Sequence, residues 1–309
     1  MENKKVAVIG AGVAGVSAAI YLKRSGLDFD IFEARAVGGQ LLFVEQVDNY
    51  AGIPAGVKGR DMAIALSGSL NELGVKPVHE EVEAVFLGND LVSIRVGGKG
   101  FDYSGLIVAT GASFKTLGAK GEHEFSGRGV SYCAICDGFF FKGKDVAVVG
   151  GGNTAVEEAL YLSNIARKVY LIHRRDTFRA MEYLQKEIHH KANIEIVLDS
   201  VIDEISGRDA LEKIIIKNLK TSVHRAIELS AVFVAIGVIP STSILKDVVN
   251  MDDGGFILTD EEMKTSSDII WACGDCRKRP LRQLVTAASE GAVAAISAYR
   301  RLKGGYISS

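Results

Sequence analysis

Residues 6–15 read Val-Ala-Val-Ile-Gly-Ala-Gly-Val-Ala-Gly, and residues 146–155 read Val-Ala-Val-Val-Gly-Gly-Gly-Asn-Thr-Ala. Each copy is a short apolar strand, then the pattern G-x-G-x-x-G/A, then a helical pattern and a second apolar strand. In this context the glycines permit a tight turn, the close approach of a pyrophosphate, and the packing of helix on strand. The pyrophosphate would lie at the helix N-terminus, where free N–H groups favour negative charge. A single glycine pattern is often an ordinary turn, but its repetition in full context predicts two dinucleotide-binding units.

The residues that end the second strand of each unit predict different ligands. Glu33 occupies this place in the first unit, where a carboxylate accepts hydrogen bonds from an adenosine ribose and repels a 2′-phosphate. The corresponding residue in the second unit is His173, and Arg174, Arg175 and Arg179 follow it. Guanidinium groups suit a phosphate dianion. We therefore expect FAD in the first unit and NADPH in the second. The alternative for the arginines is a solvated basic surface.

Later segments complete each unit. Strands over 106–111 and 232–237 both end in Ala-x-Gly, and the alternating segments 91–96 and 211–218 predict small antiparallel insertions. A strand ending in Gly-Asp and an amphipathic helix over 284–302 follow with no third nucleotide motif, so we expect them to return to the first unit.

The predicted fold class is therefore α/β, with two Rossmann-like nucleotide-binding domains of three layers (ββα). The NADPH domain is expected to be inserted into the FAD domain. We place the discontinuous FAD-binding domain at residues 1–113 and 244–309, and the NADPH-binding domain, which carries the redox cysteines, at 114–243.

Redox chemistry is indicated by Cys133-Ala-Ile-Cys136, which lies just before the second nucleotide motif. Two intervening residues allow a short redox-active disulfide, and a thiolate is the species that attacks a disulfide sulfur or a flavin. Asp137 follows directly and is a candidate proton donor and acceptor. Two alternatives are half of a structural zinc site and a pair of incidental buried cysteines.

The other two cysteines, Cys273 and Cys276, have the same spacing but a different context. Cys273 is the penultimate residue of a strand before a Gly-Asp turn, where a small buried side chain is expected. We expect this turn to present Asp275 to ribityl or phosphate groups of FAD, and we do not expect a redox role for the pair.

The composition of the chain limits the classes of function that it could have. The chain has 36 Lys+Arg against 38 Asp+Glu, a net charge of −2, which argues against a nucleic-acid partner. The first residues show no signal-peptide pattern, and the uncharged run 229–245 is interrupted by Gly237 and Pro240, so we expect no membrane span. A cytoplasmic enzyme is the expectation.

Taken together, these segments resemble the low-molecular-weight thioredoxin reductases of bacterial and archaeal type, class II pyridine nucleotide-disulfide oxidoreductases. The resemblance covers nearly the whole chain. Its densest parts are Gly127-Arg-Gly-Val-Ser-Tyr-Cys-Ala-Ile-Cys-Asp-Gly138, Gly150-Gly-Gly-Asn-Thr-Ala-Val-Glu-Glu-Ala159 and His173-Arg-Arg-Asp-Thr-Phe-Arg-Ala180, and it extends to Gly38-Gly-Gln-Leu41, Asn49 and Arg282-Gln283.

The resemblance implies a thioredoxin-disulfide reductase in which NADPH reduces FAD and FAD reduces the Cys133–Cys136 disulfide. Cys136 would be the sulfur that faces the flavin, Cys133 would attack the disulfide of thioredoxin or a thioredoxin/glutaredoxin-like protein, and Asp137 would be the acid–base group. It also implies a homodimer, no metal, and an NADPH domain that rotates on connections near 113–118 and 239–243.

The cofactor-binding residues are carried over position by position. For FAD they are Gly10, Gly12, Ala14, Glu33, Gly39, Gln40, Asn49, Val82, Thr110, Gly111, Asp275, Arg282, Gln283 and Leu284, and for NADPH they are Gly151, Gly152, Asn153, Thr154, His173, Arg174, Arg175, Arg179, Ile236 and Gly237.

One segment departs from the expected pattern. Arg277-Lys-Arg-Pro280 is unusually basic, and we interpret it as a change of the dimer or partner surface. Two other functions stay open. A flavoprotein with another electron partner, such as a ferredoxin–NADP reductase, would not need the cysteine pair, and a redox-sensing module would need an output domain.

Overall fold

The computed structural model describes residues 5–54 and 56–304. The chain forms two compact units. One contains the residues up to Ser113 together with those from Ile239 onward, and the other contains Phe114–Val238. The second unit is thus inserted into the first, which confirms the predicted arrangement.

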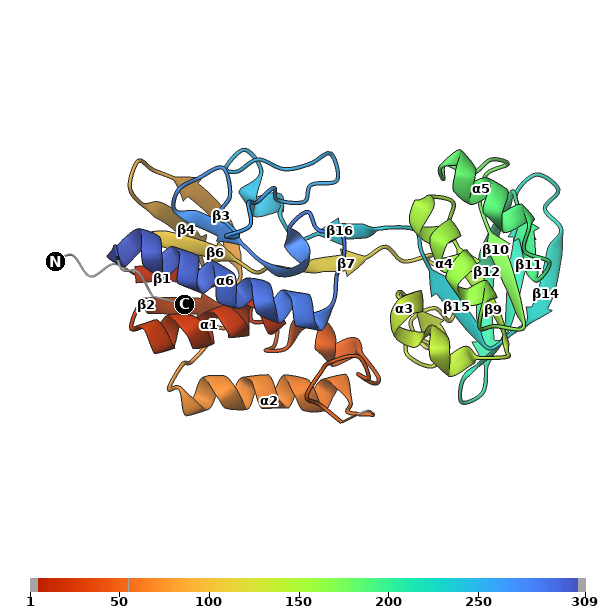
Figure 1. Ribbon diagram of the computed structural model, residues 1–309, viewed down its shortest axis with the longest axis horizontal. Helices are drawn as coiled ribbons and strands as arrows, with labels where there is room; N and C mark the ends of the chain where they lie inside the picture. The colour runs from red at the N-terminus through yellow and green to blue at the C-terminus, as the bar shows by residue number, and fades with distance from the viewer. Residues whose placement is uncertain (1–4, 55, 305–309) are drawn as a thin grey trace. The chain divides into compact units, whose positions relative to one another are not determined.

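Unit 1 is built on a parallel sheet in the order β17-β6-β1-β2. Its helices lie on one face, and a three-stranded antiparallel sheet, β3-β4-β5, lies on the other (Figure 1). The bounds are β1 (Lys5–Ile9), β2 (Asp28–Phe32), β3 (Val82–Leu87), β4 (Val92–Val96), β5 (Lys99–Tyr103), β6 (Gly105–Val108), β17 (Ile270–Ala272), α1 (Val13–Ser25), α2 (Gly59–Glu72), α6 (Leu284–Lys303), and the 3-10 turns η1 (Gly39–Phe43), η3 (Ser243–Leu245) and η4 (Gly274–Cys276).

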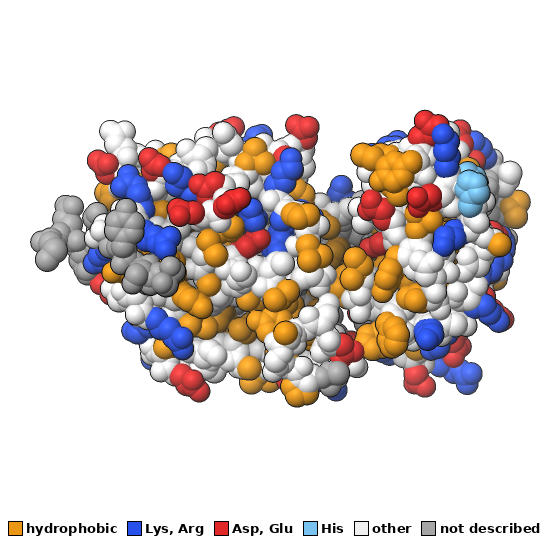
Figure 2. All heavy atoms as spheres, in the orientation of Figure 1, with side chains coloured by type: hydrophobic (Ala, Val, Ile, Leu, Met, Phe, Trp, Pro, Cys, Tyr) orange, Lys and Arg blue, Asp and Glu red, His pale blue; other side chains and the backbone are white. Residues whose placement is uncertain are grey.

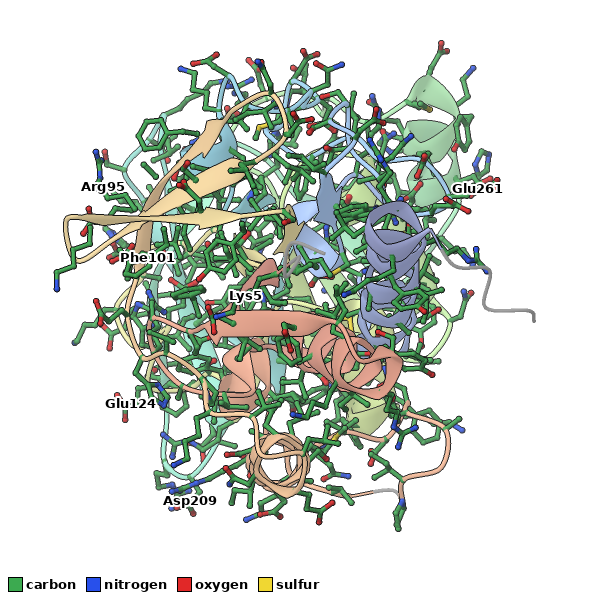
Figure 3. The ribbon with its side chains drawn as sticks, turned by 90° about the vertical axis from the view of Figure 1, so that its left-hand side faces the viewer. Lys5, Arg95, Phe101, Glu124, Asp209 and Glu261 are labelled. Carbon is green, nitrogen blue, oxygen red and sulfur yellow. A yellow bond between two sulfur atoms is a disulfide. The ribbon has the colours of Figure 1, made fainter. Side chains whose placement is uncertain are left out.

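The alternation of side chains along β1 explains these three layers. Val6 and Val8 pack against the helices, whereas Ala7 and Ile9 pack against the antiparallel sheet. Because successive side chains of a strand point to opposite faces, an entirely apolar strand requires cover on both. The antiparallel strands are covered on one face only, so buried Ile94 alternates with exposed Arg95, which Figure 3 shows on the outer side.

Helices α1 and α6 lie side by side on the helical face because glycines let them approach closely (Figure 1). A Cβ atom on Gly291 would come within 2.1 Å of the carbonyl oxygen of Ala14. A Cβ atom on Gly15 would come within 1.8 Å of the carbonyl oxygen of Gly10, at the turn between β1 and α1. The last glycine of the first motif is therefore required for packing, as the motif predicts.

Unit 2 repeats the plan with the parallel order β11-β10-β9-β15-β8 and the antiparallel sheet β12-β13-β14. Val146 and Val148 of β9 pack against helices, and Ala147 and Val149 pack against the antiparallel side. The bounds are β8 (Val130–Ser131), β9 (Asp145–Val149), β10 (Lys168–Ile172), β11 (Ile194–Val197), β12 (Ser200–Gly207), β13 (Leu211–Asn218), β14 (His224–Glu228), β15 (Ala231–Val234), α3 (Ala134–Asp137), α4 (Asn153–Ser163), α5 (Glu182–His189) and η2 (Gly138–Phe141).

The chain passes from one unit to the other at two short strands, β7 (Ala112–Phe114) and β16 (Val238–Pro240), which pair as a two-stranded sheet. On the face visible in Figure 2, Lys and Arg side chains are interspersed with Asp and Glu in both units. None of the helices within residues 5–54 and 56–304 is both long enough and apolar enough to cross a membrane.

Candidate redox and nucleotide sites

Cys133 and Cys136 form a disulfide at the start of α3. Cys133 is the N-cap of this one-turn helix, and its sulfur accepts the backbone N–H of Cys136 at 3.2 Å. Both cysteines are partly exposed. The bonded sulfurs agree with the predicted disulfide, and their partial exposure is not that of incidental buried cysteines.

Ser131 connects the disulfide with Asp137. Its hydroxyl accepts the backbone N–H of Cys133 at 3.1 Å and donates to Oδ2 of Asp137 at 2.6 Å. Asp137 is thereby held beside the cysteine pair by a buried serine. Sequence reasoning missed Ser131, although a hydroxyl two residues before a helix N-cap is a common local hydrogen-bonding pattern.

Glu158 of α4 is a second acidic group next to the redox helix. Its carboxylate accepts the backbone N–H of Ala134, the residue after Cys133, and its Oε2 is buried without a hydrogen-bond partner among the described residues. Burial raises the pKa of Glu158 to about 7, and the Ala134 bond acts in the opposite direction. This residue was also missed, because its burial depends on how α3 packs on α4.

Exposed apolar side chains lie next to the disulfide cysteines in the sequence of unit 2. Ile135 lies between the two cysteines and is 62% exposed, and Phe139 and Phe140 follow Asp137 at 68% and 44%. Such exposure of large apolar groups beside a reactive bond is typical of a surface that another protein covers.

The first nucleotide loop joins β1 to α1. Gly12 is the N-cap of α1 and offers no side chain to the free N–H groups of the first turn, which contains no acidic residue. Glu33 directly follows β2, where its Oε2 accepts the N–H of Ala11 at 2.7 Å and its Oε1 accepts that of Arg35 at 2.9 Å. These bonds fix the carboxylate at the edge of the loop.

The remaining residues predicted for FAD all lie in unit 1, and several contact one another. Gly39 approaches Gly12, the amide of Gln40 donates to the carbonyl of Ala112, and Asn49 donates to Oε1 of Gln283 at 3.0 Å. The others lie directly after β1 (Gly10), in α1 (Ala14), at the start of β3 (Val82), after β6 (Thr110 and Gly111), in η4 (Asp275), two residues before α6 (Arg282) and at the first residue of α6 (Leu284). Val82 has its side chain in the core, so only its backbone could reach a ligand.

The first nucleotide loop and the residues predicted to bind FAD have features that a bound dinucleotide requires. A Cβ atom on Gly12 would meet nothing within 4 Å, so space is open in front of the helix N-terminus. Oδ1 of Asp275 and Nε of Arg282 are buried without hydrogen-bond partners in the described part of the chain. Buried polar atoms of this kind normally have partners, and the hydroxyl and phosphate groups of FAD would supply them.

The second nucleotide loop, between β9 and α4, has the same form. Gly152 is the N-cap of α4 without a side-chain cap, and a Cβ atom there would meet nothing within 4 Å. A Cβ atom on Gly151 would instead come within 2.2 Å of the ring of His173, which is buried and bonded through Nε2 to the Thr177 carbonyl at 3.1 Å. Burial lowers the pKa of His173, so the ring forms an uncharged wall of the loop.

The three arginines expected to bind a 2′-phosphate follow β10. Arg174, Arg175 and Arg179 are exposed, and within the described ranges none of them forms an ion pair. The N–H of Arg179 donates to the carbonyl of Gly151 at 2.7 Å, which ties the arginine segment to the loop. Asn153, at the start of α4, accepts the N–H of Met181 at 2.9 Å, whereas Thr154 is exposed and Ile236 and Gly237 follow β15.

Comparison with known proteins agrees with this geometry. The family described as Pyridine nucleotide-disulphide oxidoreductase matches residues 4–291. A thioredoxin reductase of Peptoclostridium acidaminophilum is 38% identical over 99% of each chain, and one of Rickettsia typhi is 40% identical over 94% of this chain and 96% of its own. The chain belongs to the thioredoxin reductases. The crystal structure of the Streptococcus pyogenes thioredoxin reductase superposes with a TM-score of 0.94 at 37% identity, covering 98% of this chain and all of that one.

These findings confirm the predicted family, the fold class, and FAD and NADPH as the cofactors of a thioredoxin reductase. The individual ligand residues stay predictions, supported by the contacts described above.

The second cysteine pair of this thioredoxin reductase is buried. Cys273 and Cys276 are not joined in a disulfide, and the Cys276 thiol lies 3.3 Å from the carbonyl oxygen of Cys273. Burial raises the pKa of Cys276 to about 11 and that of Cys273 well above its ordinary value, so neither forms a thiolate readily. The expectation that this pair has no redox role fits this burial.

The interpretation of the basic segment as a surface feature is wrong for two of its three charged residues. Arg277 and Arg279 point inward, with side chains 14% and 2% exposed, and both form ion pairs with Glu290 of α6. Only Lys278 is exposed. The sequence gives no sign of this arrangement, because Glu290 lies on the last helix.

Proposed function

We propose that this thioredoxin reductase transfers electrons from NADPH through FAD to the Cys133–Cys136 disulfide and from there to thioredoxin. The observation that carries the proposal is the disulfide itself. It is partly exposed, begins a helix, and has Asp137 fixed beside it by Ser131.

Bound FAD would supply the two-electron relay between the nicotinamide and the disulfide. The two-electron reduction breaks the Cys133–Cys136 bond and leaves the pair as thiol and thiolate, with Asp137 giving or taking the proton at sulfur. The residues that would hold FAD are the Gly12 loop, Glu33, Asn49, Gln283, Asp275 and Arg282.

Transfer to the partner follows by thiol–disulfide exchange. The Cys133 thiolate attacks one sulfur of the partner disulfide, which forms a mixed disulfide and releases the other partner sulfur as thiolate. Asp137 takes the proton of Cys136, and the resulting Cys136 thiolate attacks the sulfur of Cys133, which restores the bond between them and releases the partner as a dithiol. Two electrons leave the chain, and two protons are taken up by the partner.

The choice between the two nucleotides follows from charge. Arg174, Arg175 and Arg179 beside the second loop are exposed and form no ion pair with any residue that the structure describes, so they suit the 2′-phosphate of NADPH. Glu33 beside the first loop would repel this phosphate and suits the plain adenosine ribose of FAD.

The partner is proposed from the surface around the disulfide. Ile135, Phe139 and Phe140 form an exposed apolar rim that a small protein could cover while it presents its own disulfide to Cys133. Thioredoxin, or a related protein of thioredoxin or glutaredoxin type, meets this requirement.

We also propose a cytoplasmic homodimer. A groove beside α1 and α6 has a mainly apolar floor. It is lined by Tyr21, Ala292, Val293, Ile296 and Ser297, with Glu262 and Arg300 also contributing, and Tyr21 and Val293 are 41% and 37% exposed. A second copy could cover this groove. Sedimentation of the Val293→Glu variant tests the dimer, since a charge in the buried centre of the interface should yield monomers.

The decisive test is anaerobic titration of the purified flavoprotein with NADPH. Uptake of two electrons by FAD and two more by the disulfide would support the proposal. In the Cys133→Ser and Cys136→Ser variants uptake should fall to the two electrons of FAD, and reduction of thioredoxin should stop. Unchanged uptake, or continued reduction of thioredoxin by both variants, would contradict it.

A further inference from the structure

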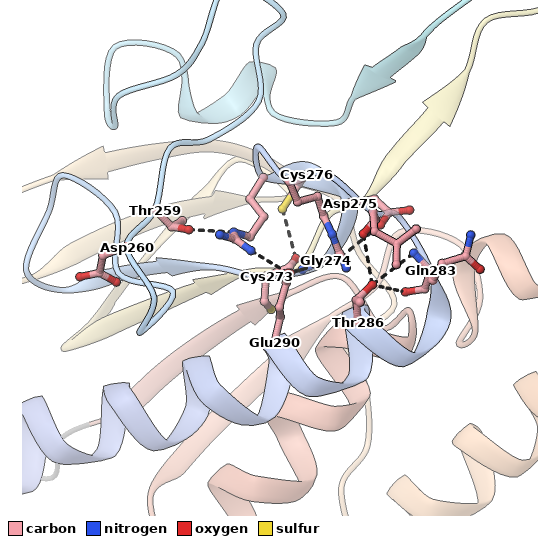
Figure 4. A network of polar contacts seen from close by, with 12 residues as sticks. Thr259, Asp260, Cys273, Gly274, Asp275, Cys276, Gln283, Thr286 and Glu290 are labelled. Carbon is pink, nitrogen blue, oxygen red and sulfur yellow. Dashed lines mark hydrogen bonds and ion pairs between the residues drawn. The ribbon is translucent and has the colours of Figure 1, made fainter. Parts of the chain in front are cut away.

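A buried ion-pair network connects the turn after β17 with helix α6 (Figure 4). Glu290 is its centre. Oε1 of Glu290 lies 2.6 Å from Nη1 of Arg277, while Oε2 lies 3.2 Å from Nη1 of Arg279 and accepts the N–H of Gly274 at 2.8 Å. The side chain of Glu290 is 12% exposed. A buried carboxylate needs such donors, and this one is fully supplied.

Asp275 belongs to the same network but lacks a comparable hydrogen bond. Its Oδ1 lies 3.5 Å from Nη1 of Arg279, a distance at which charges still interact but a hydrogen bond is weak. This oxygen is buried and has no hydrogen-bond partner in residues 5–54 and 56–304. Burial raises the pKa of Asp275, whereas the charges of Arg279 and Arg282 act to lower it.

The arrangement keeps the guanidinium of Arg279 beside Asp275 without a hydrogen bond to Oδ1 of Asp275. Arg279 favours the ionised carboxylate, yet its hydrogen bond goes to Glu290. Arginine side chains form strong bidentate pairs with carboxylates when the geometry allows. If the charge of Glu290 were removed, Arg279 would have Asp275 as its remaining carboxylate and would occupy the oxygen that is now unbonded.

We infer that Glu290 and Arg279 are a positioning pair for the flavin nucleotide, in which Glu290 holds the guanidinium of Arg279 away from Asp275 so that this carboxylate can accept a hydroxyl of FAD. The inference rests on the proposed function, which places Asp275 in the FAD site. It assigns Arg279 of the basic segment a role within the unit and not on its surface.

The test is FAD affinity, measured on protein stripped of flavin by the change in flavin fluorescence on rebinding. Glu290→Gln should weaken binding roughly ten-fold, the equivalent of one hydrogen bond to a charged group. The double variant Glu290→Gln/Arg279→Met should recover affinity to within about two-fold of the wild type, because the competing cation is gone. All variants are measured at the same pH.

A double variant as weak as Glu290→Gln would overturn the inference, since Glu290 would then act only through the Gly274 turn. Should Glu290→Gln be too unstable to purify, Arg279→Met and the double variant carry the test. Without the cation they should bind FAD equally, and a further loss of affinity in the double variant would count against the pairing.

Glu83→Gln is the matched control, because Glu83 pairs with exposed Arg95 at 3.1 Å. A wild-type chain that binds no FAD would refute the proposed function instead.

Discussion

The hydroxyl of Ser131 donates a 2.6 Å hydrogen bond to Oδ2 of Asp137 and accepts the N–H of Cys133. One buried side chain thus fixes both the proposed acid–base group and the backbone of the attacking cysteine. The position of Asp137 is therefore set by unit 2 before any ligand binds.

We expect Ser131→Ala to lower the turnover number with thioredoxin by roughly ten-fold, because Asp137 loses a hydrogen bond that orients it. FAD content and NADPH affinity should not change. Steady-state kinetics and flavin absorbance measure the two effects. The matched control is Ser93→Ala, which removes a hydroxyl bonded to Asp102 on the exposed antiparallel sheet of unit 1. Equal kinetics for both variants would remove Ser131 from the mechanism.

The glycines of the first loop should separate folding from cofactor binding. Gly15→Ala forces a Cβ atom to within 1.8 Å of a carbonyl oxygen and should destabilise unit 1 by about 3 kcal/mol. Gly12→Ala meets open space in the protein and should leave thermal stability of the flavin-free chain unchanged while it blocks the pyrophosphate. Gly152→Ala should retain FAD and lose NADPH. Normal FAD binding by Gly12→Ala would show that the phosphate lies elsewhere.

The arginines of unit 2 should decide nucleotide preference. Replacing Arg174 and Arg175 by alanine should raise the KM for NADPH by roughly ten-fold or more with little effect on NADH, since only NADPH carries the 2′-phosphate. FAD content serves as the internal control. An unchanged ratio of kcat/KM for the two nucleotides would place the phosphate on other residues.

The apolar rim should affect the partner and not the cofactors. We predict that Phe139→Ala raises the KM for thioredoxin about ten-fold, while anaerobic reduction by NADPH proceeds as in the wild type. Phe86→Ala is the control, because Phe86 is 53% exposed in unit 1 and lies far from the disulfide in sequence. If both variants reduce thioredoxin equally well, the partner does not dock on this rim.

Glu158 should make stability depend on pH. Burial raises its pKa from 4.5 to about 7, so the native state binds a proton more tightly than the unfolded state. The contribution of Glu158 to wild-type stability should therefore fall as pH rises from 4.5 to 7, by at most about 3 kcal/mol. Glu158→Gln removes this dependence. The melting temperature of the variant, relative to that of the wild type, should therefore increase as the pH rises over the same range. Glu157→Gln, at the exposed neighbouring position, should behave as the wild type.

The parts of the site that the sequence predicted are those defined by local pattern. Both glycine loops, Glu33 at the end of β2 and the Cys133–Cys136 pair depend on residues close together in the chain or on a repeated fold. Ser131, Glu158 and Glu290 were not foreseen, because each acts through a contact between elements that no spacing rule specifies. The inward orientation of Arg277 and Arg279 was missed for the same reason, since Glu290 belongs to a helix that begins after the segment ends.

The insertion of unit 2 has a consequence for synthesis on the ribosome. Unit 2 is continuous, so all its strands emerge before the chain returns to unit 1 at Ile239. Trp271 of β17 and the small residues of α6, which cover β6 and α1, emerge last. The apolar surface of the segment that is synthesised first therefore stays uncovered until α6 has been synthesised. We expect the growing polypeptide to depend most on chaperones during this interval.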